Sequence, residues 1–357
     1  MNRNQREYKY DLMRVFLTLL VVVGHSTYYT IQTPFGGIDY DGMMSIYGIK
    51  DSQLHVVTKD LTALIYMFHM PAFFALSGSL FRKQIISDRW KNVGILAHKK
   101  FERLIMPCVF VWICWNIPIK YFSDYYTGVK PYYWFVQMVF PECVYLWFLE
   151  SLFFVFIITY IIAKLKIPER FKMSIIFGLW LISIVYSCIY GNDWIIFGNP
   201  FKYTFWFAVG LQYEYISEKC VLIKQKKFNI ILLPVWLGLI VIAKLFLVGV
   251  IKIVVKQLVV PLLAIILLYY WSDRIVDLLK NKSLLVKLSE VSFGIYLWAE
   301  PLNYLIMHYV VDKYGIAALE SNEIAMGIYL TRIFGTILVA TFITLILRKI
   351  KFPIKAY

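Results

Sequence analysis

The chain has 357 residues, of which 60% are hydrophobic and 18% aromatic, and its formal net charge is +15. This balance is far from that of a water-soluble globular protein and indicates an integral membrane protein. The charge does not indicate a nucleic-acid-binding protein, because the basic residues lie between hydrophobic stretches and not on one polar face. We therefore expect the lipid bilayer, and no nucleic acid, among its partners.

About ten apolar stretches are long enough to cross a bilayer, which needs roughly 20 helical residues. In chain order they lie near 11–31, 61–81, 103–122, 144–163, 172–190, 203–216, 228–248, 251–271, 290–309 and 326–347. No linker separates these stretches, and no internal repeat is visible among them. The sequence therefore predicts an all-α integral membrane protein, a bundle of about ten transmembrane helices in a single domain over 1–357.

The positions of the basic residues predict which side of the membrane each loop faces. Most of the 37 Lys and Arg residues lie in alternate segments, namely the two tails, 82–103, 164–172, 219–227 and 274–287. Because cytoplasmic loops accumulate Lys and Arg, we expect both termini to be cytoplasmic and the protein to lie in the cell (plasma) membrane. The longest outer loops, 32–60 and 123–143, are rich in Gly, Tyr and Asp and suit a sugar acceptor, although aromatic residues are equally common as interfacial belts.

The first predicted span, 11–31, carries two residues that hydrocarbon disfavours, Arg14 and His25. Eleven helical residues make about three turns and 16 Å, so both side chains project from one stripe of the helix. Ionisable residues inside a span indicate a functional site by default. A neutral imidazole can act as a general base, and a planar guanidinium can hold an anionic donor. Asp11 either orients Arg14 or forms a simple interfacial ion pair with it.

Other polar residues within the spans are candidates for the acceptor site or for its support. His69 lies at the same predicted depth as His25, and its alternative is a hydrogen-bonded structural histidine. Glu300 and Arg332 lie at depths near enough for an intramembrane ion pair, which we interpret as structural. Glu150 is expected to face the acceptor cavity, with Asn116 and Tyr296 as hydrogen-bond donors or as contacts between helices.

The five cysteines show no CxxC spacing and so indicate neither a disulfide framework nor a metal site. We likewise expect no tightly bound cofactor.

Five short motifs lie in order along the chain: RVFLTLLVVVGH, FHMPAFFALSG, HKKFERLIMP, LWFLESLF and SFGIYLWAEP. Together they resemble the membrane-bound acyltransferase-3 family, in particular its branch of bacterial sugar and capsule polysaccharide O-acetyltransferases. The resemblance covers almost the whole chain. It implies a ten-helix bundle that moves an acyl group from cytoplasmic acyl-CoA to a hydroxyl of an extracytoplasmic or lipid-linked glycan.

The resemblance also implies roles for individual residues. The residues that match Arg14 and His25 are essential in that family, and the cluster that opens the third span binds the donor together with Arg14; here it is Lys99, Lys100 and Arg103. Family members usually have a histidine after the YLW motif, where this chain has Ala299 and Glu300.

The sequence thus predicts an O-acetyltransferase with acetyl-CoA as co-substrate, His25 as general base and direct transfer to the acceptor. The alternative is a polysaccharide exporter or secondary transporter without acyl transfer, a class in which inverted repeats are common. The sequence leaves open the acceptor sugar, the acyl chain length and the oligomeric state, a homo-oligomer included.

Overall fold

The fold was analysed in a computed structural model, which describes residues 7–87, 89–137, 145–190 and 198–354. The chain forms two compact units. Unit 1 consists of Met1–Leu17, Leu64–Leu96 and Val155–Glu290, and unit 2 of Thr18–Ala63, Ala97–Phe154 and Val291–Tyr357. Each unit is therefore built from segments that are far apart in the sequence.

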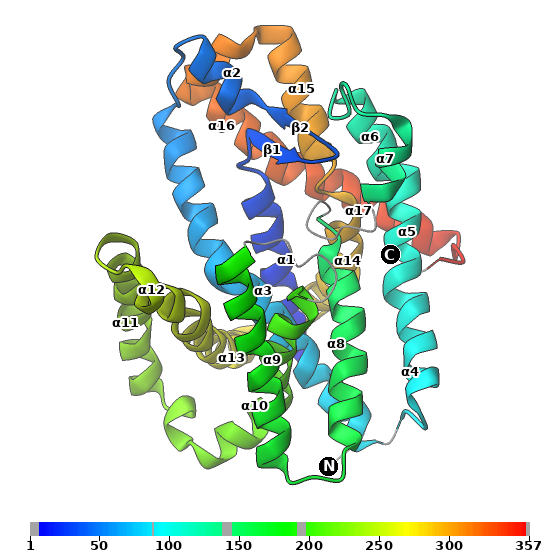
Figure 1. Cartoon of the computed structure of the whole chain (residues 1–357), viewed down its shortest axis with the longest axis vertical. Coiled ribbons are helices and arrows are strands. Elements are labelled where there is room, and N and C mark those ends of the chain that lie inside the picture. The colour runs from blue at the N-terminus through cyan, green and yellow to red at the C-terminus, as the bar shows by residue number, and fades with distance from the viewer. Residues whose placement is uncertain (1–6, 88, 138–144, 191–197, 355–357) are drawn as a thin grey trace. The chain divides into compact units, whose positions relative to one another are not determined.

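Nearly all regular elements are helices, and each predicted span overlaps at least one of them (Figure 1). In chain order the elements are α1 (Tyr8–His25), β1 (Thr30–Thr33), β2 (Gly36–Asp39), α2 (Tyr40–Ile46), α3 (Gln53–Ile86), α4 (Val93–Lys100), η1 (Phe101–Ile105), α5 (Met106–Val111), η2 (Trp112–Asn116), α6 (Ile117–Phe122), α7 (Pro131–Val136), α8 (Trp147–Lys164), α9 (Glu169–Tyr190), α10 (Gly198–Lys219), η5 (Val221–Lys224), α11 (Lys226–Leu245), α12 (Gly249–Val254), η6 (Val255–Val259), α13 (Val260–Leu278), α14 (Ser283–Trp298), α15 (Leu302–Tyr314), η7 (Ile316–Glu320), α16 (Asn322–Leu330), η8 (Thr331–Gly335) and α17 (Thr336–Lys349).

Seven helical segments of the described chain are long and apolar enough to cross a membrane. They are Gln53–Ile86, Val93–Phe122, Trp147–Lys164, Glu169–Ile189, Lys226–Leu245, Gly249–Leu278 and Asn322–Lys349. The other three predicted spans, 11–31, 203–216 and 290–309, overlap helices but are not among these seven, so the count of ten and the cytoplasmic termini remain predictions.

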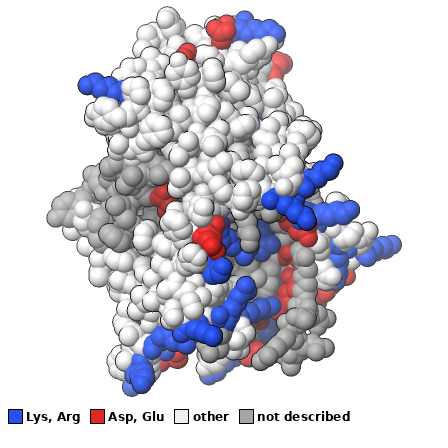
Figure 2. Space-filling view, turned by 90° about the vertical axis from the view of Figure 1, so that its right-hand side faces the viewer, with Lys and Arg blue, Asp and Glu red and all other residues white. Residues whose placement is uncertain are grey.

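The exposed surface agrees with a membrane protein. Phe334, Leu338 and Phe342 follow one another at helical spacing, and each has more than 60% of its surface exposed. In Figure 2 the visible face is mostly uncharged and is interrupted by groups of Lys and Arg side chains. Apolar stripes of this kind are stable in contact with lipid chains. A water-soluble protein would have to cover them.

Two of the predicted spans have the wrong shape. The first helix ends at His25, and the chain then forms an antiparallel hairpin, β1–β2, followed by α2. The hydroxyls of Ser26 and Thr27 bond back to the carbonyls of Val22 and Gly24, which closes the helix end. His25 is therefore a terminal residue of its helix and not a central one. Because α1 ends at His25 and α3 begins at Gln53, the outer connection is 26–52 and is displaced toward the N-terminus relative to the predicted 32–60.

The predicted span 290–309 is broken. Helix α14 ends at Trp298 and α15 begins at Leu302, with Glu300 and Pro301 between them. Proline lacks the amide hydrogen that a continuing helix needs, and it disfavours helical geometry in the residue before it. The break thus follows from Pro301 and places Glu300 at a bend.

Short π-helical segments interrupt three of the long helical segments, Val93–Phe122, Gly249–Leu278 and Asn322–Lys349. The segments η1, η2 and η6 end two residues before Pro107, Pro118 and Pro261, respectively. Each proline lacks the N–H group of one helical hydrogen bond, and the π turn before it accommodates this break in the pattern. The fourth segment, η8, has no proline after it and contains Arg332.

Two glycines allow the closest helix contact of unit 1. A Cβ atom at Gly210 of α10 would lie 1.7 Å from the carbonyl oxygen of Ala75 in α3, and one at Gly78 would lie 1.9 Å from the carbonyl oxygen of Phe207. The hydroxyl of Ser79 donates to the Gly210 carbonyl at 2.7 Å. Small residues at these positions therefore let the two backbones meet, a packing typical of membrane helices.

We predict that Gly210→Ala destabilises the protein by about 2 kcal/mol or more, because the added methyl overlaps a backbone carbonyl that cannot rotate away. Thermal unfolding of the detergent-solubilised protein measures this change. The matched control is Gly178→Ala in α9, where nothing lies within 4 Å of the new Cβ. That substitution should be neutral or stabilise by up to about 1 kcal/mol. Equal effects of the two substitutions would contradict the close contact.

Candidate functional site

Arg14 and His25 lie on one uninterrupted helix, α1, as the sequence predicts. By helical geometry they share a stripe about 16 Å long. Arg14 belongs to the part of α1 in unit 1, and His25 ends the part in unit 2. The surroundings of each are therefore described within its own unit.

In unit 1, Arg14 is oriented by a triangle of hydrogen bonds. Its Nη1 donates to Ser289 Oγ at 2.7 Å and lies 3.5 Å from Asp11 Oδ1, while Ser289 Oγ donates to Asp11 Oδ1 at 2.6 Å. The Arg14 side chain remains 35% exposed, whereas that of Asp11 is 8% exposed. The predicted pairing of Asp11 and Arg14 is thus present, and Ser289 makes it an orienting arrangement. Ser289 was not predicted, because serines are common in apolar helices and nothing local distinguishes this one.

His69, also in unit 1, is engaged by its own helix. Its Nδ1 lies 2.9 Å from the carbonyl oxygen of Ile65, one turn earlier, and its ring stacks on that of Tyr66. Because the carbonyl can only accept, the ring nitrogen donates. This geometry favours the structural alternative for His69.

The predicted donor cluster lies at the junction of α4 and η1. Lys99 is exposed and forms an ion pair with Glu102 at 3.2 Å, and His98 lies 3.3 Å from the same carboxylate. Lys100 is buried and Arg103 is exposed. An anionic donor at this cluster would have to compete with Glu102.

In unit 2, Arg332 fixes the end of the helix that carries His25. The guanidinium is 1% exposed, and its Nη1 donates to the carbonyl oxygens of Ser26 at 3.1 Å and Tyr28 at 2.8 Å. Its Nε and Nη2 donate to the carbonyl oxygen of Asn303 at 3.3 and 3.0 Å. A cation at a helix C-terminus is also favoured by the helix dipole.

The predicted ion pair between Glu300 and Arg332 is not the arrangement that forms. The guanidinium bonds to backbone carbonyls, and Glu300 Oε1 accepts from the hydroxyl of Tyr304 at 2.6 Å. The physical reason is that α1 ends at His25, so the carbonyls beyond it have no helical partners and need donors.

Three of the remaining candidates lie around Tyr145 in unit 2, and a fourth, Glu150, lies near one of them, Tyr296. Tyr296 donates from its hydroxyl to the Tyr145 carbonyl at 2.8 Å, and the Asn116 amide lies next to the Tyr145 hydroxyl. Glu300 and Glu150 lie within electrostatic range of Tyr296. The sequence grouped Glu150 with Asn116 and Tyr296 but paired Glu300 with Arg332. Tyr145 was missed because aromatic residues near an interface resemble belt residues.

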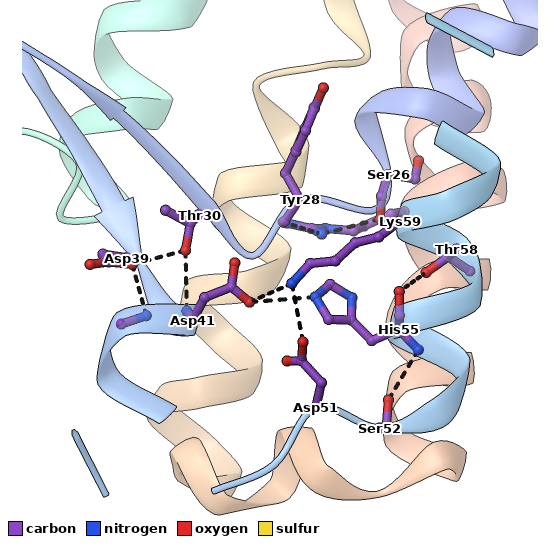
Figure 3. A network of polar contacts seen from close by, with 12 residues as sticks. Ser26, Tyr28, Thr30, Asp39, Asp41, Asp51, Ser52, His55, Thr58 and Lys59 are labelled. Atoms are coloured by element: carbon purple, nitrogen blue, oxygen red, sulfur yellow. Dashed lines mark hydrogen bonds and ion pairs between the residues drawn. The ribbon is translucent and has the colours of Figure 1, made fainter. Parts of the chain in front are cut away.

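A second polar network, also missed, lies at the start of α3 and comprises Asp41, Asp51, His55 and Lys59 (Figure 3). Lys59 Nζ lies 3.1 Å from Asp41 Oδ1 and 3.2 Å from Asp51 Oδ2, and His55 Nε2 lies 3.5 Å from Asp41 Oδ1. Although two carboxylates and a histidine this close could suit a metal ion, the Lys59 ammonium already bridges the carboxylates. The signal in the sequence was a histidine and two lysines among several Asp residues in 39–60.

The network holds Asp41 in its charged form. Burial would raise the pKa of Asp41, but hydrogen bonds from His55, Thr30 and Lys59 lower it to about 2. The ring of His55 stacks on that of Tyr29, with centroids 3.6 Å apart. The network therefore joins α2 to the start of α3 and to the segment after His25.

Comparison with known proteins defines the class. The family described as "Acyltransferase domain" (acyltransferase-3) matches residues 7–348, so the chain belongs to this family. The family inferred from the motifs is thereby confirmed.

The chain is also similar to the nodulation protein NolL of Mesorhizobium japonicum, with 28% identity over 145 residues. That match covers 38% of this chain and 34% of NolL, so it spans about a third of the relative's length. No solved structure matches the chain significantly.

We predict a pH dependence of stability that comes from Asp41. Its pKa is lower in the folded protein than its ordinary value of 3.8, so its contribution is complete above pH 3.8 and is lost as the pH falls to about 2. Relative to wild type, Asp41→Asn should lose on the order of 1 kcal/mol at pH 5 and almost nothing near pH 2, since the side chain is partly exposed.

Thermal unfolding between pH 5 and pH 2 measures this difference. Asp312→Asn is the control, because Asp312 is an exposed carboxylate of the same unit. A constant gap between wild type and Asp41→Asn over this range would show that the carboxylate is not held in its charged form.

Proposed function

We propose that this membrane acyltransferase transfers an acetyl group from cytoplasmic acetyl-CoA to a hydroxyl of an extracytoplasmic or lipid-linked glycan. His25 is the general base, and Arg14 binds the anionic part of the donor. The observation that carries the proposal is α1, a continuous helix with an arginine and a histidine on one stripe. Ser289 orients the arginine, and Arg332 binds the backbone that directly follows the histidine. Family membership favours acyl transfer over the transport alternative.

The reaction needs few protein groups. The hydroxyl oxygen attacks the thioester carbonyl carbon while His25 accepts the hydroxyl proton. The carbon–sulfur bond then breaks, and His25 returns the proton to the departing sulfur, which gives the ester and free CoA. The imidazole ends in its starting state, so no acyl-enzyme is required.

The surroundings of Arg14 and His25 suit donor binding and general base catalysis, respectively. Arg14 is aligned by Ser289 and Asp11 but remains partly exposed, so its planar fork is available to a phosphate or to the pantetheine carbonyl. His25 ends its helix, and Arg332 holds the carbonyls of Ser26 and Tyr28 directly after it, which fixes the backbone from which the imidazole projects. We assign Lys99, Lys100 and Arg103 to the donor site as well, on the cytoplasmic side.

We predict that His25→Ala lowers acetyl transfer by about 10²- to 10⁴-fold, the usual contribution of a general base. Transfer is measured as CoA release and as acetylated product by mass spectrometry. His308→Ala is the control, because His308 lies in the same unit and faces Asp124. A His25→Ala protein that folds and retains more than a tenth of the activity would exclude His25 as the base.

We further predict that Arg14→Lys raises the KM for acetyl-CoA about 10- to 100-fold and changes kcat less, because lysine keeps the charge but loses the bidentate fork. Steady-state kinetics in reconstituted membranes measures both constants. Arg170→Lys, at an exposed position of unit 1, is the control. An unchanged KM with a reduced kcat would place Arg14 at the reacting carbonyl and not on the donor's phosphates.

A further inference from the structure

Glu300 carries a buried acceptor that the protein does not satisfy. The residue is 5% exposed, its Oε1 accepts from Tyr304, and its Oε2 has no hydrogen-bond partner among the described residues. The same holds for the side-chain oxygen of Asn303, which is 4% exposed and lies on the first turn of α15. Buried polar atoms without partners are rare, because each costs a desolvation penalty that only water or a ligand can offset.

The backbone supports this reading. Glu300 lies in the break between α14 and α15, at a depth where the sequence predicts a continuous span. Irregular backbone at membrane depth is tolerated where it is buried in protein or lines a water-filled path.

The surrounding charges restrict what Glu300 can bind. The ammonium of Lys120 lies over the rings of Tyr125 and Tyr304, at 4.1 and 5.5 Å from their centroids, and it acts on Glu300 electrostatically, as does Arg332. Two cations close to one carboxylate repel a third, so a cationic ligand is disfavoured. The remaining partner for Oε2 is a neutral donor such as an alcohol.

Arg332 brings this acceptor close to the base. Its guanidinium bonds on one side to the carbonyls of Ser26 and Tyr28, which follow His25, and on the other to the carbonyl of Asn303, which follows Glu300. A guanidinium is only a few ångströms across, so the His25 segment and the Glu300 bend are neighbours within unit 2.

We propose that Glu300 is an acceptor-binding residue, whose Oε2 accepts a hydrogen bond from a sugar hydroxyl adjacent to the hydroxyl that is acetylated. This proposal rests on the function proposed above and specifies its acceptor subsite. It makes Glu300 a determinant of which sugar, and which face of that sugar, is presented to His25.

The test uses acetyl-CoA with p-nitrophenyl glycosides of glucose, galactose, mannose and N-acetylglucosamine, together with the monodeoxy derivatives of the best acceptor. In the wild type, one monodeoxy derivative should have a kcat/KM about 10- to 100-fold lower than those of the other monodeoxy derivatives. In Glu300→Gln, kcat/KM for the parent acceptor should fall by a similar factor relative to wild type. The variant should then use the parent acceptor and that deoxy derivative with kcat/KM values that differ by no more than about twofold. The KM for acetyl-CoA should not change.

Glu323→Gln is the control, because Glu323 is exposed at the start of α16. If Glu300→Gln does not accumulate, Glu300→Asp keeps the charge, shortens the reach and should lose the same discrimination. Discrimination equal to wild type in the folded variant would mean that Oε2 binds only water, and the inference would be overturned. If the wild type acetylates none of the glycosides, the proposed acceptor class fails, and this inference fails with it.

Discussion

A fully buried guanidinium is stable only when its N–H groups find acceptors, and Arg332 finds them on the backbone of two separate segments. This requirement determines much of unit 2. It closes the end of α1, fixes the segment that follows His25 and ties it to the first turn of α15. Removing the cation would leave several buried carbonyls without donors, which costs more than the loss of one favourable contact.

The two arginines placed in spans by the sequence illustrate two uses of the same side chain. Arg332 is 1% exposed and bonds to backbone carbonyls, which suits a residue that holds structure. Arg14 is 35% exposed and is held along one edge by Ser289 and Asp11. A guanidinium that is oriented but still accessible is suited to binding an anion that arrives and leaves.

The sequence predicted the membrane class, the family and the predominance of helices, because long apolar runs and ordered motifs are local signals. It also predicted that Arg14 and His25 share one helix and that Asp11 pairs with Arg14. It placed the end of α1 wrongly, since apolar content does not show that Ser26 and Thr27 hydroxyls close the helix. It missed Ser289, Tyr145 and the Asp41 network because their partners are distant in sequence, and it paired Glu300 with Arg332 because depth along a helix does not specify direction around it.

The π turn at Arg332 has a consequence for how this chain varies. Such a turn holds one residue more than an α-helical turn of equal rise, and three other π turns in the chain accompany prolines. At η8 the extra residue sets the angular position of the guanidinium. Deleting one residue there would restore an ordinary, equally apolar α-helical turn and leave the flanking turns in place, yet the residues inside the segment, Arg332 among them, would change their angular positions. The number of residues in this short segment is thus constrained as tightly as their identity, although a one-residue deletion would leave the hydropathy of the helix unchanged.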